Sequence, residues 1–229
     1  MSQSLRTNAI VLRRTNYGEA DRILLILTPN NGKISVMARG VRKEKSRLAG
    51  GVELFAVCEM TMVKGSNNSG DLWTLTGSKL NTFFDQIISD YDRLQFGYES
   101  IKSISTASEN LNDDAFFELL HKNFLSLNNL NINLKIVQTW FYLRLAGILG
   151  EGLNTATDNN GMNLVEDARY DFNAYDRVFS FRENGEFGAD ELKVLRLLSV
   201  NDPEIVARIS GINEIIEHCL FVARSIAKL

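Results

Sequence analysis

A cationic stretch from residue 39 to residue 47 holds the side chains of this chain whose chemistry is most readily interpreted. It reads Arg-Gly-Val-Arg-Lys-Glu-Lys-Ser-Arg, so five of its nine residues are cationic and only Glu44 opposes them. Guanidinium and ammonium groups neutralise phosphates and release condensed counterions, which gives affinity for a polyanion without sequence preference. The stretch therefore favours a phosphodiester ligand over a small metabolite, and a solvated surface loop is the alternative interpretation.

Other cations precede this stretch, and all of them fall within 35 residues of the chain. The candidate DNA-binding cations are Arg13, Arg14, Arg22, Lys33, Arg39, Arg42, Lys43, Lys45 and Arg47. Tyr17, in a turn, is the preferred aromatic face for base stacking. Phe55 and Trp73 are more typical of the core of a small barrel.

Charge is divided unevenly along the chain, although the net charge is only −3. Residues 1–80 hold 12 Lys and Arg against 6 Asp and Glu, whereas residues 81–229 hold 13 against 22. A basic first part and an acidic second part indicate two modules with different partners.

The search for catalytic residues finds little, and the sequence predicts a protein that is not an enzyme. His121 and His218 are the only histidines, and neither has a Cys or an acid at metal-ligand spacing. Paired acids that could hold a divalent ion for a nuclease fall in helical patterns, where solvated or capping acids are expected. These pairs are Asp90 with Asp92 and Asp113 with Asp114.

Five strand-like runs position the basic stretch, and the third of them leads directly into it. The expected strands are 7–14, 22–28, 33–39, 54–63 and 72–76. In the third, Ile34, Val36 and Ala38 point one way and Lys33, Ser35 and Arg39 point the other, together with Met37, which predicts a half-buried strand with a cationic outer face. Five short antiparallel strands joined mostly by tight turns predict a small closed barrel of the OB type.

From Phe83 the apolar residues recur at helical spacing, so the chain is predicted to be α+β. Helices are expected near 83–94, 98–108, 113–127, 134–149, 189–200 and 212–227. Residues 150–188 are rich in Asn, Asp, Gly and Thr and are predicted to form an irregular insertion with short strand-like pieces at 163–165 and 177–181. The predicted domains are a barrel at 1–80 and a helical domain at 81–229.

Cellular location is also constrained by composition. Cys58 and Cys219 lie far apart in apolar segments, which predicts buried, reduced thiols rather than a disulfide or a metal site. No apolar window is long enough for a membrane helix, and the first residues contain no apolar signal core. A cytoplasmic protein is therefore expected.

The chain resembles the RecO family of bacterial DNA-repair and recombination mediators. The resemblance rests on four segments of the first fifty residues: Thr7-Asn-Ala-Ile-Val-Leu-Arg-Arg, Tyr17-Gly-Glu-Ala-Asp-Arg22, Thr28-Pro-Asn-Asn-Gly-Lys33, and Ala38-Arg-Gly-Val-Arg42 with Lys45-Ser-Arg-Leu48. Looser support comes from Phe116-Phe-Glu-Leu-Leu120 and from residues 141–150.

The resemblance implies an OB-fold barrel followed by a helical domain, and no cofactor is expected for this chain. It also implies a protein, active at the bacterial nucleoid, that binds single- and double-stranded DNA, anneals complementary strands and associates with RecR. Members of the family help RecA to displace single-stranded-DNA-binding protein. The cations named above are the positions to which DNA contact would be assigned.

The alternative to DNA binding as the main activity is an adaptor for the acidic, Phe-ended tail of single-stranded-DNA-binding protein. In that hypothesis, helices 116–127 and 134–149 form an apolar groove rimmed by Lys122, Lys135 or Arg144.

This chain departs from the family pattern in one respect. Many relatives carry a four-cysteine zinc knuckle just after the segment that matches Leu153-Asn-Thr, whereas here residues 156–159 are Ala-Thr-Asp-Asn. The insertion is therefore predicted to be a metal-free remnant that is stabilised by packing.

Overall fold

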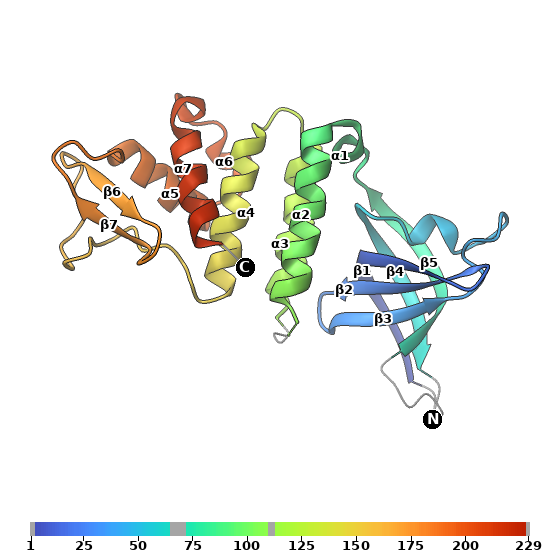
Figure 1. Ribbon diagram of the computed structural model, residues 1–229. Coiled ribbons are helices and arrows are strands. Elements are labelled where there is room, and N and C mark those ends of the chain that lie inside the picture. The colour runs from blue at the N-terminus through green and yellow to red at the C-terminus, as the bar shows by residue number, and fades with distance from the viewer. Residues whose placement is uncertain (1–2, 65–71, 110–112, 228–229) are drawn as a thin grey trace. The chain divides into compact units, whose positions relative to one another are not determined.

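The structure is a computed structural model that describes residues 3–64, 72–109 and 113–227 (Figure 1). The chain divides into two compact units, residues 1–128 and residues 129–229. This division differs from the predicted domains, since the first unit contains the barrel together with three helices.

Five strands form the barrel of the first unit: β1 (Gln3–Tyr17), β2 (Asp21–Thr28), β3 (Gly32–Ala38), β4 (Ala56–Lys64) and β5 (Leu72–Phe83). Their order is β1-β2-β3-β5-β4, and β4 pairs back onto β1. The predicted OB-type barrel is confirmed, but the expectation of antiparallel strands fails for one pairing. β3 and β5 are parallel, because both run from the end of the barrel that holds Asn31 to the end that holds the basic loop.

The inward side chains of β3 are those that the alternation predicts. Ile34, Val36 and Ala38 are buried in the barrel core, whereas Lys33 and Ser35 are only half-buried on the outer face. Register pairs Lys33 with Leu27 and Ser35 with Leu25 across the β2–β3 ladder. Since side chains alternate along a strand, this register fixes which cations can point outward.

Three helices follow the barrel within the first unit: α1 (Asp85–Ser89), α2 (Tyr91–Ala107) and α3 (Ala115–Asn128). The prediction of one helix through residues 83–94 and another at 98–108 is wrong. The break lies at Asp90, whose carboxylate accepts a hydrogen bond of 3.0 Å from the backbone N–H of Arg93. Asp90 is thus the N-cap of α2, because a carboxylate there satisfies a free N–H of the first turn.

Phe55 explains why these helices belong with the barrel. Its side chain is 2% exposed, and its ring contacts Tyr98 of α2 and Phe124 of α3 edge-on, at centroid distances of 5.1 and 5.5 Å. Gly97 permits this approach, since a Cβ there would lie 2.7 Å from the Phe55 ring. Phe55 therefore anchors the helices, in addition to being buried as the sequence indicates.

The second unit is mainly helical. Its elements are α4 (Leu134–Ile148), β6 (Tyr170–Asn173), β7 (Val178–Phe181), α5 (Ala189–Val200), α6 (Pro203–Val206) and α7 (Ile212–Ile226). Helix α4 packs against α5 and α7. Gly150, at φ 77°, follows the end of α4, as predicted, because a glycine adopts this left-handed conformation without steric cost.

The 150–188 insertion contains more order than its composition suggests. β6 and β7 form a hairpin, and the rings of Phe172, Phe179 and Phe187 pack together. The predicted strand-like piece at 163–165 forms only an isolated bridge at Asn163. The buried Asp158 carboxylate accepts the N–H groups of Asn160 and Met162, each at 2.8 Å, and so closes the turn where a zinc knuckle would begin.

Cys58 and Cys219 are free and buried, as predicted. Burial raises the pKa of the Cys58 thiol to about 11, with a smaller contribution from Glu53, and it raises the pKa of Cys219 to about 12. Across the described residues, no helix is long and apolar enough to cross a membrane.

We expect both thiols to resist alkylation in the folded protein. A pKa near 11 instead of 9.0 lowers the thiolate fraction at pH 8 about 100-fold. In the unfolded state the thiols have their ordinary pKa near 9.0, so they lose their protons at a lower pH than in the folded state. Their contribution to the free energy of unfolding is therefore complete below about pH 9 and falls as the pH rises towards 11. Iodoacetamide labelling at pH 8 with and without denaturant checks this; fast labelling of the native protein would contradict it.

Candidate nucleic-acid interface

The β1–β2 turn and the loop after β3 are joined at one end of the barrel. The Asp21 carboxylate accepts the N–H of Gly40 at 2.7 Å, and the Ala20 carbonyl accepts the N–H of Arg42 at 2.9 Å. The Arg42 guanidinium also donates to the Gly18 carbonyl at 3.3 Å. Two segments that are separated by the whole of β2 and β3 therefore form one cationic end.

Apolar anchors hold the basic loop while its cations face solvent. Val41 is buried in the barrel core, and Leu48 packs against that core. Between these anchors the backbone turns twice, with hydrogen bonds from Lys43 N–H to the Gly40 carbonyl and from Ser46 N–H to the Lys43 carbonyl. The loop is therefore a folded segment that keeps the backbone positions of its cations close together.

The charged side chains of this loop are accessible. Within the described part of the chain, no ion pair is formed by Arg39, Arg42, Lys43, Lys45 or Arg47, and all five are exposed. Arg22 is half-buried at the same end, with its Nε 3.3 Å from the side-chain oxygen of Asn16. Tyr17, 55% exposed, completes a set of seven predicted residues at this end.

Arg14 is engaged inside the protein. Its guanidinium lies 2.5 Å from the Glu53 carboxylate, and only about a quarter of its side chain is exposed. Glu53 belongs to the segment between the basic loop and β4, so this ion pair fastens that segment to β1. A phosphate would have to compete with Glu53 for Arg14.

Lys33 and Arg13 lie on the outer wall of the barrel. The Lys33 ammonium donates to the Ser105 carbonyl at 2.7 Å, which places it at the C-terminal end of α2. Burial lowers the pKa of Lys33; nearby Glu109 opposes this shift, while Arg13 adds to it. Lys33 thus satisfies a carbonyl in the last turn of a helix, and this pair is separate from the cationic end.

The predicted tail-binding residues are divided between the two compact units. Lys122 lies on α3 and Lys135 on α4, and these helices belong to different compact units. Lys135 pairs with Glu217. Arg144 donates to the Ser199 carbonyl at 2.7 Å and lines a cavity of about 300 Å³. The other residues of that cavity include Leu143, Ile148 and Leu153.

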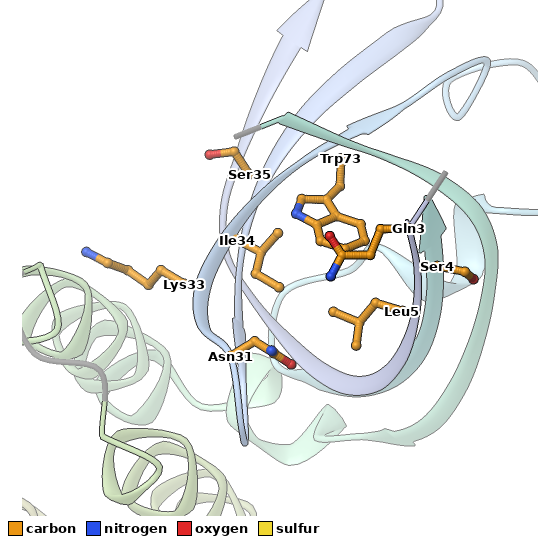
Figure 2. Close-up of a pocket in the computed structure, with 8 residues that line it drawn as sticks. All are labelled: Gln3, Ser4, Leu5, Asn31, Lys33, Ile34, Ser35 and Trp73. Atoms are coloured by element: carbon orange, nitrogen blue, oxygen red, sulfur yellow. The ribbon is translucent and has the colours of Figure 1, made fainter. Parts of the chain in front are cut away.

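A second cavity, which the sequence did not indicate, opens at the other end of the barrel (Figure 2). Its volume is about 360 Å³. The lining residues are Gln3, Ser4, Leu5, Asn31, Lys33, Ile34, Ser35 and Trp73. Trp73 is partly buried and packs against the barrel core, so the expectation of a core tryptophan is correct only in part.

The residues considered for catalysis pack against apolar rings or accept hydrogen bonds at the start of a helix. His121 is half-buried near the rings of Phe84 and Phe117, and burial lowers its pKa. The Asp113 carboxylate accepts the N–H of Ala115 at the start of α3, at 2.8 Å. Among the described residues, no three His, Cys, Asp or Glu side chains gather as a metal site would require.

Comparison with known proteins identifies the N-terminal region. Residues 1–84 match the family described as "Recombination protein O N terminal". Proteins named "DNA repair protein RecO" are 38% identical over 92 residues in Acetivibrio thermocellus and 35% identical over 125 residues in Dehalococcoides mccartyi. The first alignment covers 40% of this chain and 35% of the relative, and the second covers 54% and 48%.

A third relative of the same name, from Alkaliphilus metalliredigens, is 29% identical over 142 residues. That alignment covers 62% of this chain and 56% of the relative. The chain therefore matches these relatives over about a third to slightly more than half of their length. The matches confirm the resemblance that the first fifty residues predict.

Proposed function

We propose that the chain, whose residues 1–84 match the N-terminal region of the RecO family, acts in DNA repair as a DNA-binding recombination mediator. The observation that carries the proposal is the set of exposed cations of the basic loop, which form no ion pair with any described residue and lie beside the β1–β2 turn. Binding of single- and double-stranded DNA, strand annealing, and action with RecR, RecA and single-stranded-DNA-binding protein all belong to this proposal, as does a place at the bacterial nucleoid.

In the proposed mechanism, the cationic end holds phosphates of two strands at once. Each guanidinium or ammonium neutralises a phosphate, so the mutual repulsion of the strands falls and complementary bases can pair. The loop's backbone is fixed at Gly40 and Arg42 by hydrogen bonds to the neighbouring turn. A fixed loop loses less conformational entropy on binding than a free basic tail would.

We expect single-stranded DNA binding to weaken steeply with salt. Six cations lie at this end: Arg22, Arg39, Arg42, Lys43, Lys45 and Arg47. With about 0.7 counterion released per single-strand phosphate contact, the plot of log affinity against log salt should have a slope near −4. Fluorescence anisotropy of a labelled oligonucleotide across a sodium chloride series measures it, and a slope near zero would contradict DNA binding by this surface.

The second candidate function is capture of an acidic, Phe-ended peptide in the cavity beside Arg144. Apolar side chains of Leu143, Ile148 and Leu153 could take the ring, and the guanidinium could take the terminal carboxylate. We expect Arg144→Ala in the full chain to weaken binding of a labelled acidic peptide about tenfold, the worth of a charge-assisted hydrogen bond. Lys135→Ala, which removes a cation already paired with Glu217, is the control. If the peptide binds the unchanged protein, Arg144→Ala and Lys135→Ala with equal affinity, this site is ruled out.

A nuclease remains the third hypothesis, and we propose that the chain is not one. Asp90 caps α2, and the Asp113 carboxylate accepts the N–H of Ala115 at the start of α3, which accounts for one acid of each suspected pair. Incubation of labelled DNA with the protein and Mg²⁺ should leave the strand intact, and Mg²⁺-dependent cleavage would overturn the proposal.

A further inference from the structure

The cavity at the end of the barrel opposite the basic loop is lined by side chains that suit a flat, uncharged ring. Leu5 comes from β1, whereas Ile34 and Trp73 come from β3 and β5, on the opposite side of the closed strand order. Figure 2 shows these three side chains inside the ring of strands. A planar group that enters between them would lie against the indole on one side and aliphatic carbons on the other.

The polar groups of the cavity are neutral at its opening. Gln3 and Asn31 place amides at the rim, and each amide both donates and accepts hydrogen bonds. The one charged lining residue, Lys33, points away from the barrel, because its ammonium binds the Ser105 carbonyl of α2. The interior therefore suits a neutral ligand with a hydrogen-bonding edge better than a phosphate or a carboxylate.

We infer that this cavity binds one unpaired base of single-stranded DNA, an inference that rests on the proposed function. Bases stack on aromatic side chains whatever their sequence, and the two amides match a base edge without demanding one base. A pocket of about 360 Å³ lies within the usual range for small ligands.

The inference adds a second contact point to the proposed function. The cavity opens where β1 begins and β2 ends, whereas the basic loop lies where β1 ends and β3 ends. These ends are separated by the length of strands such as β2, which has 8 residues at about 3.3 Å each. A strand held at both ends is therefore extended along the barrel with one base unstacked.

Intrinsic fluorescence tests the inference without any substitution, because the chain has two tryptophans and the other, Trp140, is 1% exposed on α4. Titration with oligothymidylate should change the emission of Trp73, whereas an abasic oligonucleotide of equal length should bind by its phosphates and leave emission unchanged. Trp73→Ala should abolish the emission change and weaken oligothymidylate binding about fivefold or more, while abasic binding stays the same. Gln3→Leu, at an exposed rim position, is the second variant if Trp73→Ala fails to fold; it should remove part of the preference for the base-bearing strand.

The outcomes separate the two proposals. If both oligonucleotides bind equally and neither changes the emission of Trp73, the base site is wrong and DNA binding by the basic loop stands. If neither oligonucleotide binds at low salt, the proposed function fails and the base site fails with it. An emission change that the abasic strand reproduces would also overturn the base site, since it would require only phosphates.

Discussion

Replacement of four loop cations by glutamate is expected to weaken single-stranded DNA binding about 10³-fold at 0.1 M salt. The four substitutions are Arg39→Glu, Arg42→Glu, Lys43→Glu and Arg47→Glu. Each phosphate contact contributes about 0.7 of a decade in affinity at that salt concentration, so the loss of four contacts removes almost three decades. The slope of log affinity against log salt should fall from about −4 towards −1 for the same reason.

A matched variant separates this local effect from a change in net charge. Four cations of the second unit can be reversed to give the same total charge: Arg182, Lys193, Arg208 and Arg224, all of which are exposed. This control should bind DNA within a few-fold of the unchanged protein, apart from long-range repulsion that salt screens. Equal losses in the two variants, or unchanged binding in both, would show that the basic loop is not the DNA site.

Interactions between neighbours in sequence could be predicted well. The alternation of Ile34, Val36 and Ala38 placed three side chains in the barrel core and left Lys33 outside, because a strand exposes alternate residues to opposite faces. The clustering of cations between Arg39 and Arg47 could also be predicted, since their nearness in sequence guarantees nearness in space. Gly150 likewise marked the end of α4 through its backbone freedom alone.

Interactions between distant residues could not be predicted in the same way. Lys33 and Ser105 are 72 positions apart, and Arg14 and Glu53 are 39 positions apart. No local pattern indicates that either cation has a partner, so the sequence does not distinguish them from the exposed cations of the loop. The cavity around Trp73 could not be predicted either, because the residues that line it come from three strands that are distant in sequence. These residues come together only when the barrel closes.

The boundary of the first unit shows the same limit. The change from strand to helical periodicity near residue 83 suggested a domain that ends with the barrel, and β5 does end at Phe83. The compact unit nevertheless extends to Asn128, because Phe55, which directly precedes β4, packs its ring on α2 and α3. One buried aromatic residue thus unites segments that periodicity separates.

Removal of the Phe55 ring is expected to lower the free energy of unfolding of the first unit by about 3–5 kcal/mol, the usual cost of Phe→Ala in a core. The ring is fully buried, and it lies so close to Gly97 that a Cβ at position 97 would be 2.7 Å from it and would force the ring to shift. Urea unfolding followed by hydrogen exchange of the α2 and α3 amides measures the loss. Phe83→Ala, at a position 41% exposed in the same unit, is the control and should cost less than about 1 kcal/mol.

The backbone at Phe55 makes the prediction more specific. Its φ is 54°, in the left-handed region that costs a side chain about 1–2 kcal/mol and costs glycine nothing. Glycine normally destabilises by about 0.5–1 kcal/mol relative to alanine, but here Phe55→Gly should be at least as stable as Phe55→Ala. A clearly less stable glycine variant would contradict this conformation.

The same variants test whether DNA binding requires α2 and α3 to be packed against Phe55. The basic loop is fixed to the β1–β2 turn through Asp21 and Arg42, and neither bond involves α2 or α3. We therefore expect Phe55→Gly, under conditions where the barrel remains folded, to bind single-stranded DNA within about threefold of the unchanged protein, a difference of less than 1 kcal/mol. A much larger loss of affinity would mean that the helices themselves contribute to the DNA-binding surface.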